Sequence, residues 1–95
     1  MAKAACAADA RGLTDIPNIG PALARDLRLA GIAAPAQLKR KSAFDLYQRL
    51  NLVTARRHDP CVLDTFIAAV DFMNGGAPRP WWAFTAERKR RHPGI

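Results

Sequence analysis

The chain has 95 residues, of which 49% are apolar and 24% are charged. This composition is typical of a globular domain and excludes a disordered or fibrous chain, and the length suffices for one domain with one modest core. The 15 Lys and Arg outnumber the 8 Asp and Glu, and the resulting net charge of +7 favours polyanionic partners. More than half of this excess lies in residues 75–95, where it suits either nucleic-acid contact or a solvated tail.

The cysteine content and the N-terminal segment indicate an intracellular protein. Cys6 and Cys61 could form at most one disulfide, so reduced thiols are the simpler interpretation. The N-terminal segment lacks the apolar core of a secretory signal, and no apolar stretch approaches the roughly 20 residues needed to span a bilayer. We therefore expect a cytoplasmic protein without a membrane partner.

The first third of the chain predicts a turn followed by a helix. Residues 1–11 are Ala-rich and lack an apolar stripe, so we expect a frayed helix or a flexible leader. A short apolar segment at residues 13–16 precedes a turn at residues 17–20, and Pro21 suits the first helical position because it has no N–H to leave unpaired. Gly31 should end this helix in a left-handed conformation. Its apolar residues recur at helical spacing: Leu23, Leu27 and Ala30.

Two further segments carry cap residues followed by an apolar face. Pro35 can open a short helix that contains Leu38, and the Ser42 hydroxyl can cap a helix over residues 43–53. The inward face of that helix should consist of Phe44, Tyr47, Leu50 and Val53.

The last long helix should form the spine of the core. Asp59 and Pro60 give it a clear start, and residues 74–76 give it a clear end. Its inward positions are Val62, Phe66, Ile67, Val70 and Met73. Beyond the aromatic residues 81–84 comes a basic tail, residues 85–95, which we expect to fray after about Arg88.

No segment requires a strand, so we predict an all-α fold, a compact bundle of about five short helices over residues 12–84. The turn within it resembles the helix-hairpin-helix motif, whose hairpin reads hydrophobic, any residue, Gly, hydrophobic, Gly. The matching residues are Leu13, Ile16, Pro17, Asn18, Ile19, Gly20, Pro21, Leu23, Ala24 and Leu27. Ile19 should point inward, Gly20 should permit close backbone approach, and Ala24 should let the helices pack tightly. Asn18 replaces the first Gly and tolerates a left-handed backbone.

This turn predicts a phosphate site, because the start of a helix has unpaired N–H groups and a partial positive charge. The expected donors, beside Asn18 in the turn, are the backbone N–H groups of Ile19, Gly20, Ala22 and Leu23. Arg25 and Arg28 should supply charge, since Ala22 and Leu23 replace the Lys and Thr or Ser that the family often has. The resemblance also implies a monovalent cation held by hairpin carbonyls.

A second set of basic residues flanks the later helix ends: Lys39, Arg40, Lys41, Arg56 and Arg57. They could cap helix C-termini, or they could extend the phosphate-binding surface if they share its face. The sequence leaves both possibilities open.

A longer stretch, about residues 12–84, resembles the bacterial pathogenicity-locus family, often labelled mitomycin-resistance proteins. The segments that carry the resemblance are residues 31–51, residues 58–76 and the Pro80-Trp81-Trp82 cluster. The resemblance implies a compact helical domain of the helix-hairpin-helix or SAM-like type, with or without a degenerate second unit, and no established activity.

Two local clusters have both a functional and a structural interpretation. His58, Asp59 and Cys61 are too few for a structural zinc site, so we expect Asp59 to cap a helix and the thiol pKa of Cys61 to be somewhat lowered near the helix start. Trp81, Trp82 and Phe84 could stack on unpaired bases, but we expect at least one tryptophan to pack on the core.

These patterns predict a protein that binds nucleic acid, most readily DNA, without sequence specificity. The alternative is a protein-interaction module that uses the same helical scaffold and does not contact DNA. We predict no enzymatic activity, because the sequence shows no nucleophile with a base, no carboxylate pair and no phosphate-binding glycine loop. The oligomeric state is not predicted.

Overall fold

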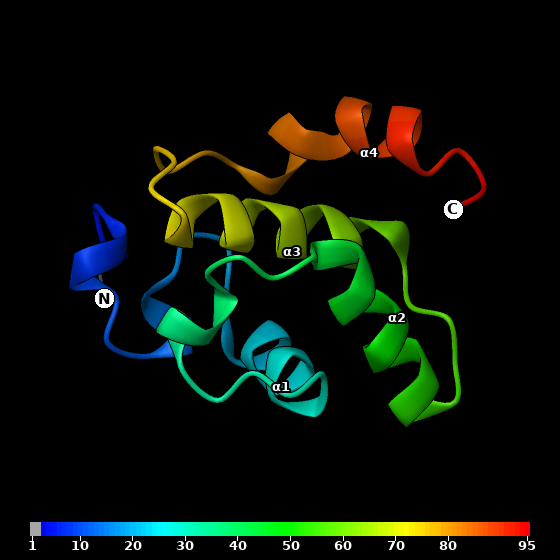
Figure 1. Cartoon of the computed structure of the whole chain (residues 1–95), viewed down its shortest axis with the longest axis horizontal. Helices are drawn as coiled ribbons and strands as arrows, with labels where there is room; N and C mark the ends of the chain where they lie inside the picture. The colour runs from blue at the N-terminus through cyan, green and yellow to red at the C-terminus, as the bar shows by residue number, and fades with distance from the viewer. Residues whose placement is uncertain (1–2) are drawn as a thin grey trace.

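The computed structural model describes residues 3–95, so residues 1–2 of the predicted leader lie outside the described residues. In that range the chain forms four α-helices and four short 3-10 turns, and no strand (Figure 1). The elements are η1 (Ala7–Asp9), η2 (Leu13–Asp15), α1 (Pro21–Leu29), η3 (Pro35–Leu38), α2 (Ala43–Thr54), α3 (Pro60–Met73), η4 (Trp81–Phe84) and α4 (Thr85–Arg91). The predicted all-α fold is confirmed. No helix within residues 3–95 is long and apolar enough to cross a membrane.

Helix α1 begins and ends as its sequence predicts. Pro21 is its first residue, and Gly31, just past its end, has a φ of +100°. The Ile32 N–H donates to the Leu27 carbonyl at 2.9 Å, and the Gly31 N–H donates to the Arg28 carbonyl at 3.0 Å. These two bonds form a Schellman motif, which satisfies carbonyls that a helix end leaves unpaired.

Helices α2 and α3 both begin at the predicted caps. The Ser42 hydroxyl accepts a hydrogen bond from the Asp45 N–H at 3.2 Å, and the Asp59 carboxylate accepts one from the Cys61 N–H at 3.0 Å. Each bond satisfies one of the N–H groups that the first turn of a helix leaves without a partner.

Helix α3 lies across the middle of the molecule, with α1 and α2 on one side and α4 on the other (Figure 1). Its largest fully buried residues are Leu63, Asp64, Phe66 and Phe72. On α2, Tyr47 and Leu50 are buried as predicted, but Val53 is 52% exposed and Leu46 is buried instead. The prediction for Val53 is wrong because the end of α2 extends away from α3 (Figure 1).

Helix α4 is held to α3 by a buried ion pair, and it does not end near Arg88 as expected. Arg88 Nε lies 2.8 Å from Asp64 Oδ1, and the Thr85 hydroxyl donates to Asp64 Oδ2 at 2.8 Å. Arg88 is only 6% exposed and Asp64 is fully buried. The hydrogen bond with Asp64 raises the pKa of Arg88 above its ordinary value, so the guanidinium stays charged. Docking of Arg88 explains why the helix continues to Arg91.

The described part of the N-terminal segment also contacts the body of the molecule. The Ala4 N–H donates to the Asp15 carbonyl at 2.8 Å. Ala4, Ala7 and Ala10 are partly buried against the core. Small side chains at this spacing let the backbone lie close to the core. The prediction of a flexible leader did not include this packing.

The substitution Asp64→Ala should lower the free energy of unfolding by about 3–5 kcal/mol, because it leaves Arg88 buried without its counter-charge. Urea denaturation followed by circular dichroism measures this loss. The control is Glu87→Gln, which removes an exposed pair with Arg91 at 3.1 Å. That pair should contribute at most about 0.5 kcal/mol. Equal losses in the two variants would show that the buried pair does not hold α4.

Candidate nucleic-acid interface

The turn of residues 16–20 connects η2 to α1. Asn18 has a φ of +73°, the left-handed conformation predicted for it, and Ile19 and Ala24 are fully buried as predicted. Gly20 has an extended backbone with φ −91° and ψ −176°, and no atom lies within 4 Å of the position a Cβ would take there. No part of the described chain makes a close approach at Gly20, and the space beside it is open.

Three of the four predicted amide donors remain without an acceptor within residues 3–95: Gly20, Ala22 and Leu23. The fourth, the Ile19 N–H, donates to the Ile16 carbonyl at 3.1 Å and is not available to a ligand. Pro21 and Ala22 are exposed, so the start of α1 faces solvent. Unpaired N–H groups at the start of a helix form a site that favours anions.

The Asn18 side chain joins this turn to the segment before η4. Its Nδ2 donates to the Arg79 carbonyl at 2.8 Å, and its Oδ1 accepts a hydrogen bond from the Trp81 N–H at 3.2 Å. The side-chain amide of Asn18 therefore has a structural role in the described molecule. No local sequence pattern indicates this bridge, because the partners are more than 60 residues apart.

The aromatic residues next to this bridge differ in exposure. Phe84 is buried, Trp81 is half-buried, and Trp82 is 64% exposed. The two indole rings meet edge to face, with centroids 5.7 Å apart. Because Asn18 binds the Trp81 backbone, the exposed Trp82 ring belongs to a segment fixed beside the turn.

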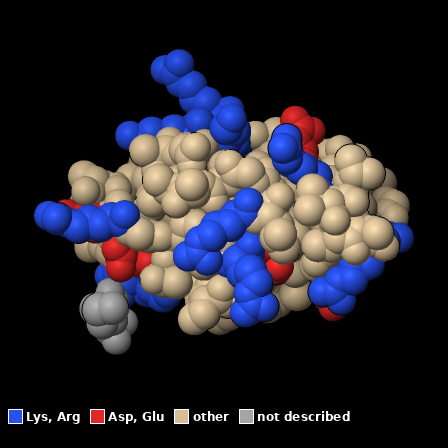
Figure 2. Space-filling view, turned by 90° about the horizontal axis from the view of Figure 1, so that it is seen from below, with Lys and Arg blue, Asp and Glu red and all other residues tan. Residues whose placement is uncertain are grey.

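The basic side chains on the face seen in Figure 2 do not form one continuous patch. Arg25 and Arg28 are exposed on α1 and form no ion pair within the described range. Seen from below in Figure 2, Lys and Arg side chains lie in separate groups with uncharged surface between them.

The second predicted set of basic residues divides between several places. Arg40 and Lys41 line a groove with Gly31 at the C-terminal end of α1, about 13 Å along the helix from its start. Arg49, which the sequence analysis missed, lines the same groove. Arg49 occupies a polar position of α2, and that position is the signal by which the sequence could have indicated it.

The remaining members of the second basic set, Lys39, Arg56 and Arg57, do not line this groove. Lys39 lines a shallow depression beside η1, together with Ala7 and Ala8. Arg57 donates to the Gly94 carbonyl at 3.2 Å near the C-terminus, and Arg56 is exposed beside it in sequence. Lys39 and Arg57 therefore lie beside two different segments, η1 and the C-terminus.

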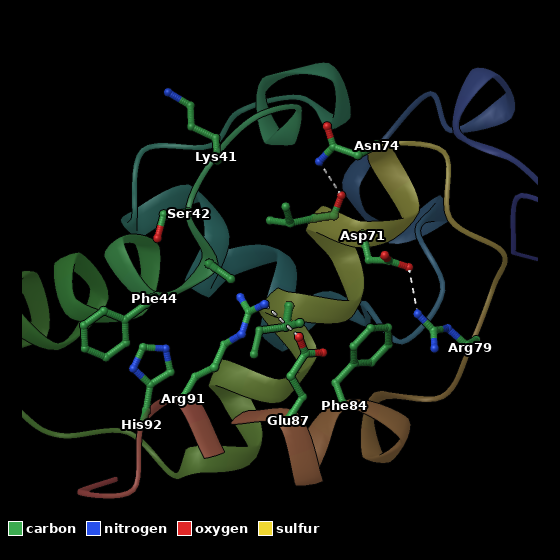
Figure 3. A pocket seen from close by; sticks show the side chains of 13 residues that line it. Lys41, Ser42, Phe44, Asp71, Asn74, Arg79, Phe84, Glu87, Arg91 and His92 are labelled. Carbon is green, nitrogen blue, oxygen red and sulfur yellow. Dashed lines mark hydrogen bonds and ion pairs between the residues drawn. The ribbon is translucent and has the colours of Figure 1, made fainter. Parts of the chain in front are cut away.

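A hollow of about 530 Å³ lies between α2, α3 and α4 (Figure 3). Its charged side chains face one another: Arg79 pairs with Asp71 at 3.4 Å, and Arg91 pairs with Glu87. The Phe44 ring stacks on the His92 imidazole with centroids 4.1 Å apart. These two pairs compensate Arg79 and Arg91, and Lys41, which also lines the hollow, is its one cationic side chain outside an ion pair among the described residues.

The predicted cap role of Asp59 is confirmed, and its hydrogen bond from the Cys61 N–H lowers the pKa of the Asp59 carboxyl. The predicted lowering of the Cys61 pKa is wrong, because burial raises that pKa and the nearby Asp59 raises it further.

His58 is held by Asn51 Oδ1, which accepts from its backbone N–H at 2.9 Å and lies 2.8 Å from its Nδ1. Cys6 and Cys61 are both free thiols.

Lys3 contacts two backbone carbonyls at this turn, where the family resemblance implies a monovalent cation. Its Nζ donates to the Thr14 carbonyl at 2.5 Å and to the Ile19 carbonyl at 2.6 Å. With the ammonium bonded to both oxygens, the residues present do not fit a second cation at this point. Lys3 was not predicted from the sequence, because it is distant in sequence from the turn.

Comparison with known proteins gives the chain a family. Residues 6–90 match the sequence model of the family Cdd1, described as "Pathogenicity locus". The chain is also 43% identical over 82 residues to "Mitomycin resistance protein McrB" of Streptomyces lavendulae, an alignment that covers 86% of this chain and 78% of that protein. No solved structure matches. The chain belongs to the pathogenicity-locus family.

The bridge formed by Asn18 can be tested with two substitutions. Asn18→Gly keeps the left-handed backbone and loses both hydrogen bonds, so the free energy of unfolding should fall by about 1–2 kcal/mol. Asn18→Ala should lose about 1 kcal/mol more, because alanine is strained in this conformation. Urea unfolding followed by tryptophan fluorescence measures both, and a glycine variant as stable as the wild type would contradict a stabilising bridge.

Proposed function

We propose that this member of the pathogenicity-locus family binds nucleic acid, DNA by preference, through the phosphate backbone and without reading sequence. The observation that carries the proposal is the set of three amides at the exposed start of α1, those of Gly20, Ala22 and Leu23, which have no acceptor within residues 3–95. On this interpretation residues 13–29 act as a helix-hairpin-helix motif whose first helix is the short turn η2. The degenerate second unit stays a prediction.

A phosphate oxygen is the ligand that suits these amides. They combine hydrogen-bond donors with the partial positive charge, about half a unit, at the start of a helix. Backbone donors meet phosphates rather than base edges, and phosphate contacts carry no direct sequence information. The proposed binding therefore tolerates any sequence.

Arg25 and Arg28 would add charge near the same phosphate path. Both are exposed and lie about one and two turns after Pro21 on α1. Asp26 between them offsets part of this local charge. The net charge of +7 adds a general attraction to polyanions.

The open space at Gly20 permits a direct test of the amides. Gly20→Asp introduces no clash, and an aspartate at this N-cap position can accept hydrogen bonds from the first-turn amides. The variant should fold at least as well as the wild type and bind DNA about tenfold or more weakly, because its carboxylate occupies the donors and repels phosphate. Gly20→Ala, the matched control, leaves the amides free and should keep the wild-type affinity.

Fluorescence anisotropy with duplex, single-stranded and branched DNA measures this binding. For two to four neutralised phosphates, the logarithm of the wild-type affinity should fall with the logarithm of salt concentration at a slope of about −2 to −4. Removal of residues 86–95 is unsuitable as a control for tail charge, because it deletes the partner of buried Asp64. The double substitution Lys89→Gln with Arg90→Gln is the suitable control for tail charge, since both residues are exposed. The proposal fails if no DNA binds at low salt, or if Gly20→Ala weakens binding as much as Gly20→Asp.

A second candidate function is association with a protein, with a second copy of this chain as the simplest partner. The observation that favours it is exposed apolar surface at the end of α2, where Leu52 is 81% and Val53 is 52% exposed. A contiguous exposed apolar patch is typical of a contact surface, and these two residues would form part of such a patch.

Sedimentation velocity tests this second candidate. If the end of α2 joins two copies, the wild type should sediment as a dimer at high concentration, and Leu52→Gln with Val53→Gln should be a monomer because the buried apolar area is lost. Arg56→Gln, an exposed change near the same helix end, is the control and should leave the dimer intact. A wild type that stays monomeric throughout contradicts self-association.

A further inference from the structure

The Lys3 side chain reaches the turn before α1 from the other end of the N-terminal segment. Its ammonium donates to the Thr14 carbonyl in η2 at 2.5 Å and to the Ile19 carbonyl at 2.6 Å. The two oxygens thus lie on either side of residues 15–18 and converge on one positive charge. Such charge-assisted hydrogen bonds are shorter and stronger than neutral ones.

The path of the backbone fixes this position. The Ala4 N–H, next to Lys3, donates to the Asp15 carbonyl at 2.8 Å, and Ala4 is packed against the core. The side chain therefore starts from an anchored point beside η2. An anchored lysine reaches its acceptors at a smaller entropic cost than one on a free chain end.

Two carbonyl oxygens that point at one place repel each other unless a cation or a hydrogen-bond donor lies between them. Carbonyl oxygens can replace the hydration shell of K⁺, so such a place is suited to a monovalent cation. In this chain the ammonium makes the same contacts and is covalently attached. A free ion would have to displace it.

We propose that Lys3 is a built-in replacement for the monovalent cation at this turn, so that the turn holds its shape without K⁺ or Na⁺. Removal of the ammonium should convert the same two carbonyls into a site for K⁺ or Na⁺. The proposal concerns the stability of the turn and holds whether or not the chain binds DNA.

Thermal unfolding in chloride salts of K⁺, Na⁺ and tetramethylammonium, at one ionic strength, tests it. The wild type should have the same Tm in all three salts. Lys3→Met should unfold about 5–10 °C lower in tetramethylammonium, because two charge-assisted hydrogen bonds are lost, and should recover at least half of that in K⁺ or Na⁺. Lys89→Met, a change at an exposed lysine, is the control and should behave as the wild type.

Three results would overturn the proposal. The first is a wild-type Tm that rises in K⁺ or Na⁺ over tetramethylammonium. The second is a Lys3→Met variant as stable as the wild type in every salt. The third is a Lys3→Met variant destabilised equally in all three salts, which would make Lys3 a hydrogen-bond donor and nothing more.

A measurement on the wild type covers the case in which Lys3→Met does not fold. The hydrogens of a bonded lysine ammonium exchange more slowly with water than those of exposed lysines. Nitrogen-detected NMR should therefore retain the Lys3 Nζ signal at a pH where the signals of Lys39, Lys41 and Lys89 are lost. Equal exchange at all four lysines would show that the ammonium is not held, and the proposal would fail.

Discussion

The buried pair of Asp64 and Arg88 determines how the C-terminal third of the molecule lies on α3. Asp64 is fully buried and accepts hydrogen bonds from Arg88 Nε at 2.8 Å, from Arg88 Nη2 at 3.3 Å and from the Thr85 hydroxyl at 2.8 Å. A buried carboxylate with fewer donors would not recover the cost of leaving water. Because all three donors come from α4, the helix has one position on α3 at which this charge is satisfied.

The same constraint reaches the candidate interface through the chain. Once α4 and η4 are held on α3, residues 79–81 lie where the Asn18 side chain can bind the Arg79 carbonyl and the Trp81 N–H. Lys3 binds the Ile19 carbonyl from the N-terminal side. Segments from both ends of the chain therefore meet at residues 16–20. A turn fixed from two sides presents its amides in one arrangement, which lowers the entropic cost of binding a ligand there.

The features that the sequence predicted correctly depend on neighbours within a few residues. The starts of α1, α2 and α3 follow from Pro21, Ser42 and Asp59, and the left-handed Gly31 and Asn18 follow from local backbone preferences. These rules need no knowledge of the rest of the fold. The exposure of Arg25 and Arg28 follows in the same way from helical spacing.

The features that were not predicted from the sequence are contacts between residues that are distant in the chain. Arg88 and Asp64 are 24 residues apart, and Asn18 and Arg79 are 61 apart, so no local pattern marks either contact. At the candidate site the Ile19 N–H was assigned wrongly for a different reason, because a tight turn pairs it with the Ile16 carbonyl three residues earlier. Sequence spacing identified the turn, but only the hydrogen bonds show which of its groups are free.

These hydrogen bonds narrow what the turn can hold. The Ile19 N–H, the Ile19 carbonyl and the Asn18 side chain all have partners, so the unpaired groups reduce to three N–H donors at one helix start. Such a set suits one phosphate group, and even with Arg25 and Arg28 the surface would neutralise only about two to four phosphates, which gives weak affinity at physiological salt. Two copies joined by another surface would bind one nucleic acid more tightly through effective concentration alone. Leu52 lies in the groove at the opposite end of α1 from these amides, so pairing through α2 would leave them exposed. The two proposed functions are therefore compatible in one molecule, with self-association raising the affinity of an otherwise weak phosphate site.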